Sequence, residues 1–381
     1  MKISKFMFAA AVAAMTMASC QKQEPAQESK NLKSVEVQIS NVFSGTKAAN
    51  KFGNLEGQKV MLKSVQFFFS DGTTLYEAKD AEGNKADVYY DSDELAAMSN
   101  ITAKFHFLPA SVKKVIVLGN YTEMVATQES ALYKEVEIIN CQDVENLPLY
   151  AEGLLGAPQS NTHNNGDNAH LSNVYKVDLR VLPPVARFEI TGIGCSLSAS
   201  SSKIVKVNSM AFADFYDRCN IGTGALTSLR SVALTQQGIF AYFQQQMSPS
   251  KWNNDFFNEL DGEEQEGNSH PVAEFTATNP SLSTNIAYNF FCNGAPSPVL
   301  LLNVVEYDNA EAMEQGIATP GYLQTNTYRL NSTEAVTTFE PGKIYRMAIN
   351  FSEDDLQHQD RCLDITLEVV EWSVINVTPE F

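Results

Sequence analysis

The stretch "VYKVDLRVL", residues 174–182, carries the clearest structural signal in the chain. Its apolar residues alternate one by one with polar residues: Tyr175, Val177, Leu179 and Val181 with Lys176, Asp178 and Arg180. Successive side chains of an extended strand point to opposite faces of a sheet. The alternation therefore predicts a strand with one apolar and one polar face.

The same period of two recurs along the chain, in "SVEVQIS" at 34–40, "KIYRMAINF" at 343–351 and "CLDITLEV" at 362–369. Other runs rich in β-branched and aromatic residues lie between clusters of Gly, Asn, Asp, Ser and Pro, at 60–69, 112–118, 134–139, 204–213, 286–292 and 298–306. Helices are expected only at 92–99, capped by Ser92 or Asp93, and at 121–132. Many short strands with little helix predict an all-β protein built of β-sandwiches.

The first residues predict export. Lys2 and Lys5 precede a short apolar run, and the small residues Ala18 and Ser19 precede Cys20. This pattern is typical of a secretory signal peptide, here 1–19, and it resembles a bacterial lipobox in which Cys20 is lipidated and becomes the mature N-terminus. The alternative is an ordinary signal with a chance cysteine. Residues 20–33 are polar and predict a flexible tether, and the chain beyond Cys20 is expected to be soluble and outside the cytoplasm.

Length and a double proline predict two domains. Pro183 and Pro184 follow the strand of 174–182 and cannot continue a central ladder. We therefore expect an N-terminal domain at 34–183 and a C-terminal domain at 184–381.

Composition argues against several classes of partner. The formal net charge is −18, which repels nucleic acid and anionic lipid. Besides Cys20 there are five scattered cysteines, which form no C-x-x-C pair. They argue against a disulfide framework and a zinc site, although one or two bridges and buried free thiols both remain open.

No catalytic, metal-binding or cofactor motif is found, and we expect no enzyme activity and no cofactor. His163, Asp167 and His170 match no metal spacing and predict a solvated loop, as does the acidic run 259–267. Exposed Trp252 or the Asn-rich loop around His163 could serve a glycan-binding or ligand-binding surface lipoprotein, which we keep as an alternative function.

The two ends of the mature chain are the most distinctive regions. The strand at 34–41 is followed by the loop "VFSGTKAANKFGN", residues 42–54, in which Lys47 and Lys51 offer sites for proteolytic nicking. The C-terminal stretch is strand-forming throughout, with Leu363, Ile365, Leu367 and Val369 on one face. At Val370, Trp372 and Val374 the apolar phase shifts by one residue, which predicts a β-bulge or a change of sheet.

Together these features resemble the fimbrillins of Bacteroidales, the major and minor subunits of type V pili. The resemblance rests on the lipobox, the strand before the lysine loop, the mid-chain "VYKVDLRVLPPVARFEITGI" and the terminal "LDITLEVVEWSVINVTPEF". The "ARFEI" opening of the second domain and the V-x-x-W of the final strands are its most specific parts. It covers the whole chain in order.

This resemblance implies two transthyretin-like Greek-key β-sandwich domains and a lipoprotein precursor at the outer membrane that becomes part of a surface fimbrium. It further implies cleavage in the loop, which would remove 34–47, and polymerisation by strand exchange. Val35, Val37 and Ile39 would then form the outgoing strand, and 363–381 would hold the donor strand of a neighbouring subunit, with Leu363 to Val374 at its core. The implied partners are other fimbrial subunits, a processing protease and a host or bacterial surface receptor.

The chain departs from the family pattern at the cleavage site. The family is cut after arginine, whereas this chain has no arginine before Arg180. Lys47, followed by Ala48, stands at the expected position, and Lys51 is the second candidate. The missing arginine also favours an uncut, lipid-anchored subunit at the fimbrial base, which is the closest alternative.

Overall fold

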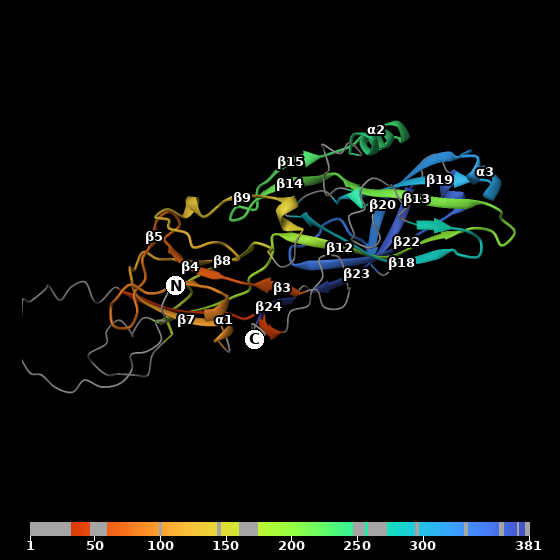
Figure 1. The fold of residues 1–381 in the computed structure, drawn as a ribbon. Helices are drawn as coiled ribbons and strands as arrows, with labels where there is room; N and C mark the ends of the chain where they lie inside the picture. Colours follow the sequence, from red (N-terminus) through yellow and green to blue (C-terminus); the bar gives the residue numbers. More distant parts are fainter. Residues whose placement is uncertain are drawn as a thin grey trace, which may run out of the picture.

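The structure, a computed structural model, is all-β with a few short helices, as the sequence predicts (Figure 1). It describes residues 32–45, 59–98, 101–142, 146–159, 174–246, 256–257, 273–292, 294, 297–330, 334–357, 362–371 and 373–377. No described helix is long and apolar enough to cross a membrane.

The N-terminal half contains two sheets that pack face to face. One is three-stranded, in the order β11 (Val174–Leu179), β1 (Lys33–Ile39), β7 (Ile101–Leu108). The other runs β10 (Leu149–Leu154), β8 (Lys114–Gly119), β4 (Val65–Ser70), β5 (Leu75–Tyr76), with β6 (Tyr89–Tyr90) also on β4. Phe105 of β7 meets Phe67 and Phe69 of β4 at ring-centroid distances of 5.3 and 4.8 Å. These contacts close the core of a β-sandwich.

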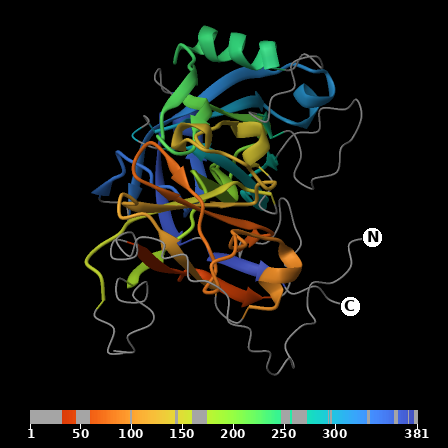
Figure 2. The same ribbon diagram turned by 90° about the vertical axis from the view of Figure 1, so that its left-hand side faces the viewer.

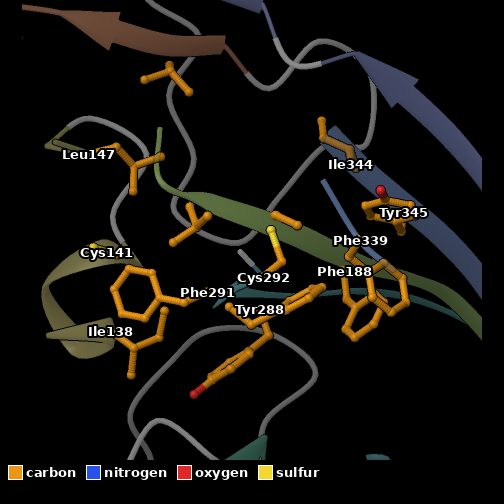
Figure 3. Packing of buried hydrophobic residues seen from close by; sticks show 14 of the residues in the cluster. Ile138, Cys141, Leu147, Phe188, Tyr288, Phe291, Cys292, Phe339, Ile344 and Tyr345 are labelled. Carbon is orange, nitrogen blue, oxygen red and sulfur yellow. The ribbon is translucent and has the colours of Figure 1, made fainter. Parts of the chain in front are cut away.

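The C-terminal half is built on a ten-stranded sheet. Its order is β16 (Phe256–Phe257), β13 (Ile204–Ala213), β19 (Val299–Tyr307), β20 (Thr319–Leu330), β23 (Cys362–Glu371), β22 (Lys343–Ser352), β12 (Val185–Ser196), β18 (Ser281–Phe291), with β17 (Ala273–Phe275) on β13 and β21 (Glu334–Ala335) on β20. Phe188 of β12 stacks on Phe212 of β13 at 5.2 Å and on Tyr328 of β20 at 5.3 Å. Figure 3 shows Phe188 beside Phe339 and Tyr345 in this core.

Two small sheets connect the halves of the chain. In the first, β14 (Phe215–Asn220) lies between β15 (Leu226–Arg230) and β9 (Glu135–Glu137). In the second, the C-terminal strand β24 (Ser373–Val377) lies between β2 (Val42–Gly45) and β3 (Lys59–Leu62). Figure 2 shows the blue β24 beside the red and orange strands of the other end of the chain. The main hydrophobic cluster also runs through both halves, so the division at 183 and 184 stays a prediction.

One of the two predicted helices forms with a different cap, and the other does not form. The helix predicted at 92–99 is α1 (Ser92–Ala96), but Asp91 caps it, accepting hydrogen bonds from the N–H groups of Asp93 and Glu94. The helix predicted at 121–132 is wrong, because only the 3₁₀ turn η2 (Glu129–Ala131) forms there. The other described helices are α2 (Gln236–Gln246), α3 (Ala310–Glu314), α4 (Glu353–Gln357) and the 3₁₀ turn η3 (Ile138–Cys141).

Candidate strand-exchange site

Strand β1 is the central strand of its sheet. It pairs in parallel with β11, from Ser34 opposite Val174 to Ile39 opposite Leu179, and antiparallel with β7. Its inward side chains Val35, Val37 and Ile39 are 1, 0 and 3% exposed, as the alternation predicts. Burying three such side chains stabilises the strand by about 5–9 kcal/mol before hydrogen bonds are counted. The position that β1 fills between β11 and β7 is the β1 slot.

Polar side chains hold both ends of β1. At its start, the Ser34 hydroxyl lies 2.9 Å from His106 Nδ1, and Lys33 Nζ donates to the Val112 carbonyl at 2.6 Å. Just after its end, the buried Asn41 amide exchanges two hydrogen bonds with the backbone of Val181, at 2.7 and 2.9 Å. Asn41 therefore continues the pairing where the strand bends.

On the outer face of β1, Glu36 lies between two lysines of the neighbouring strands. Its carboxylate is 3.2 Å from Lys104 Nζ of β7 and 3.4 Å from Lys176 Nζ of β11. Partial burial alone would raise the pKa of Glu36, but the hydrogen bonds and charges of Lys104 and Lys176 hold that pKa below its ordinary value. The ionised carboxylate thus ties the three strands together across the polar face.

The chain after Asn41 is not a loop throughout, as the sequence predicted for 42–54. Residues 42–45 form β2, which pairs in parallel with β24 from Val42 opposite Val374 to Gly45 opposite Val377. Only two residues, Ser40 and Asn41, separate β1 from β2. The first segment of the described chain therefore forms two strands that pair with different partners.

The predicted donor stretch is divided between two sheets. Strand β23 lies between β20 and β22, and its inward residues Leu363, Ile365 and Leu367 are buried. Val369, near its end, is 37% exposed. The phase shift predicted after Val369 is a change of sheet, because β23 ends at Glu371 and β24 starts at Ser373 beside β2 and β3.

Strand β24 is enclosed on both edges by strands from the N-terminal end. It pairs in parallel with β3 from Ser373 opposite Lys59 to Asn376 opposite Leu62. Helix α1 also packs beside it. Figures 1 and 2 both show β24 next to β3. The C-terminal end of the chain thus docks on the half that holds the β1 slot.

Other predicted site residues lie outside the described part of the chain. These are Cys20, Lys47, Ala48, Lys51 and Trp372, together with Trp252, His163, Asp167, His170 and the acidic run 259–267. The described thiols of Cys141, Cys195, Cys219 and Cys292 are free and buried. Burial raises the pKa of Cys219 to about 11 and that of Cys292 to about 12, as expected for packed, unreactive thiols.

Comparison with solved structures finds similar chains along most of the length. A fimbrilin (FimA) from Porphyromonas gingivalis is 10% identical with a TM-score of 0.48, and the match covers 91% of this chain and 99% of that one. A protein assigned to cell adhesion from Bacteroides eggerthii is 12% identical with a TM-score of 0.45, covering 91% and 97%. The tip fimbrial protein Mfa3 from Porphyromonas gingivalis is 9% identical with a TM-score of 0.35, covering 90% and 100%.

The chain resembles Bacteroidales fimbrial proteins. No protein-family model and no curated protein sequence matches it. The likeness is distant, at 9–12% identity.

Proposed function

We propose that this protein is a structural subunit of a fimbria, and not an enzyme, and that it polymerises by strand exchange. It is exported as a lipoprotein on Cys20 and cut after Lys47, with Lys51 as the second site. The burial of β1 between β11 and β7 is the observation that supports the proposal most directly. Because β1 and β2 precede residues 46–58, a single cut there separates both from the rest of the chain.

Loss of β1 would leave a site that needs a strand. The facing edges of β11 and β7 would carry unpaired N–H and C=O groups, and the apolar pocket filled by Val35, Val37 and Ile39 would be open. Such a gap binds an extended segment through main-chain hydrogen bonds, while alternate side chains give specificity. The C-terminal strand of a second copy is the segment that we propose for this role.

Within the predicted donor stretch, the two strands differ in how readily they can leave. Removing β23 would break its pairing with both β20 and β22 and expose three buried side chains. Strand β24 is shorter, with 5 residues against the 10 of β23. We therefore place the exchanging segment beyond Glu371, and β23 stays in its own sheet as the base from which that segment extends.

The fimbrial roles printed for the similar structures extend to this chain only as part of this proposal. An uncut subunit that keeps its lipid at the fimbrial base is the alternative, and the missing arginine favours it. The N-terminus of the surface protein separates the two, since Ala48 indicates a stalk subunit and lipidated Cys20 on every copy indicates an anchor.

Limited digestion with a lysine-specific protease tests the cut. The recombinant chain is expected to give a product that starts at Ala48 and then a ladder of oligomers on a gel. Lys47→Ala is expected to move the new terminus to Phe52, because Lys51 is then the next site, and Lys51→Ala is expected to behave like the parent. Changing both lysines together, Lys47→Ala with Lys51→Ala, is expected to prevent the cut in this segment and the ladder. Mass spectrometry identifies the new terminus.

Two results would count against the proposal. A chain cut at Lys47 that loses β1 and stays monomeric at high concentration would rule out strand exchange. Oligomers that form equally well from the double variant, Lys47→Ala with Lys51→Ala, and from the parent would show that cleavage is not the trigger.

Acid is expected to loosen β1 in the cut chain. Because the pKa of Glu36 is lowered in the folded chain, its ionised form adds stability above the unfolded value near 4.5, and this stability is lost as the pH falls below that value. Two partly exposed ion pairs are together worth about 1 kcal/mol. Glu36→Gln should therefore release the N-terminal segment about fivefold more readily at pH 7. The difference between variant and parent, measured by gel filtration, should shrink as the pH falls below 4.5.

A further inference from the structure

We infer that β24 is a clasp that keeps the intact subunit closed, and that the cut which frees β1 also frees β24. This inference rests on the proposed function. It adds a mechanism that controls when the C-terminal strand is free to act as the donor. In the uncut chain, β24 pairs within its own molecule, between β2 and β3. A subunit in this state offers neither an open β1 slot nor a free donor.

The two strands that hold β24 differ in how firmly they are fixed. Strand β3 belongs to the core, because Val60, Met61 and Leu62 are all buried. Strand β2 pairs only with β24 among the described strands, and it is the direct continuation of β1. Whatever removes β1 therefore removes one of the two neighbours of β24.

The direction of the strands makes the enclosure covalent as well. Both β2 and β3 run parallel to β24, so the end of β2 at Gly45 lies opposite Val377 and the start of β3 at Lys59 lies opposite Ser373. Residues 46–58 join these two points, which lie at opposite ends of β24. A cut anywhere in 46–58 opens the covalent connection between the two strands that enclose β24.

After loss of β2, β24 keeps one parallel strand partner, β3, and the packing of α1 beside it. Its remaining pairing runs over four positions, from Ser373 with Lys59 to Asn376 with Leu62. An isolated pair of short strands is marginal in water, and parallel pairing is slightly weaker per residue than antiparallel pairing. The C-terminal segment should therefore detach and become available when the β1 slot opens. A subunit then gains its donor and its acceptor from one event.

Hydrogen exchange measured by mass spectrometry tests the clasp on the full chain. A recognition site for a sequence-specific protease is inserted into 46–58, so that the result does not depend on natural cleavage at Lys47. The segment before the cut is then removed by gel filtration in mild urea, and a synthetic peptide of residues 33–40 fills the β1 slot to block polymerisation. Amides of 373–377 are expected to exchange at least about tenfold faster than in the uncut chain.

A longer peptide supplies the decisive control. A peptide of residues 33–46 carries β2 as well as β1, and it is expected to restore slow exchange at 373–377, whereas the 33–40 peptide does not. A chain cut at a site inserted into 160–173, between β10 and β11, should keep β24 protected.

The inference is overturned if 373–377 stays protected with the short peptide, or if these amides already exchange freely in the uncut chain. The proposed function has a separate readout, the oligomer ladder without added peptide. Release of β24 without oligomers would refute strand exchange and leave the clasp standing. Oligomers without release of β24 would refute the clasp and leave strand exchange standing.

Discussion

A chain that ends at Glu371 is expected to fold, to be cut in 46–58 like the full chain, and then to remain monomeric. The deletion removes β24 but keeps β23 paired with β20 and β22, so the ten-stranded sheet and its core stay intact. The β1 slot still opens, because β1 and β2 are lost with the cut segment. Polymerisation should fall from a ladder to background on a denaturing gel run without boiling.

Mixing the shortened chain with the full-length chain tests which subunit supplies the donor strand and which accepts it. The shortened chain has an open slot and no donor, so it accepts β24 from a full-length subunit and ends the fibre at that point. In excess, it should convert the ladder into dimers of one full and one shortened chain. A chain that ends at Val377 keeps β24 complete and serves as the matched control, with a ladder like the parent's. A normal ladder from the Glu371 chain would place the donor in β23.

Alternation along single strands predicted much of the fold. Leu363, Ile365 and Leu367 are buried as their period of two requires, and so are Val35, Val37 and Ile39. Such patterns depend only on the pleat of an extended chain, so they can be read without knowing the neighbouring strands. The change of phase after Val369 was equally local, and it marks the passage from β23 to β24.

The sequence did not predict which strands pair with each other. Val37 lies opposite Val177, and Val42 lies opposite Val374, at the other end of the chain. Parallel pairing between such distant segments depends on which edges the rest of the fold leaves free, and no local pattern records it. The interpretation of 42–54 as a single loop failed for this reason, because β2 is a strand only through its pairing with β24.

The wrong helix at 121–132 shows tertiary contacts overriding local preference. The Gln66 side chain of β4 accepts from the N–H of Met124 at 2.9 Å and donates to its carbonyl at 2.8 Å. Because the N–H and carbonyl of Met124 bond to the Gln66 side chain, they are not available for the hydrogen bonds of a helix. The missed helix α2 did carry a signal, since Ile239, Tyr242 and Phe243 recur at helical spacing and are buried.

Glu189→Gln is expected to destabilise the folded chain by about 3–5 kcal/mol, measured by urea unfolding. Glu189 is fully buried on β12, and its two carboxylate oxygens accept from the Nε atoms of Arg187 and Arg346, both at 3.0 Å. Burial lowers the pKa of the Arg187 guanidinium, and the charge of Glu189 opposes that effect. A neutral glutamine would leave a buried cation without its counter-charge.

The cluster of Arg187, Glu189 and Arg346 also connects the two halves of the chain. Loss of Glu189 should therefore affect the N-terminal half as well. Arg187 donates to the Asn289 side chain at 3.2 Å, and Asn289 donates to the carbonyl of Cys141 in η3 at 2.6 Å. Figure 3 places Cys141 and Ile138 of η3 close to the core residue Phe291. Loss of Glu189 should therefore also speed hydrogen exchange in η3, by more than the general loss of stability speeds it in β1.

Glu36→Gln is the matched control, because Glu36 also bridges two cations but does so on a partly exposed face. Its cost should be about 1 kcal/mol. Replacing the whole buried cluster, with Arg187→Met, Glu189→Leu and Arg346→Leu together, should recover most of the stability lost in Glu189→Gln, because no buried charge then remains unpaired. Equal losses in Glu189→Gln and Glu36→Gln would contradict this account, since burial of the charges would then make no difference to stability.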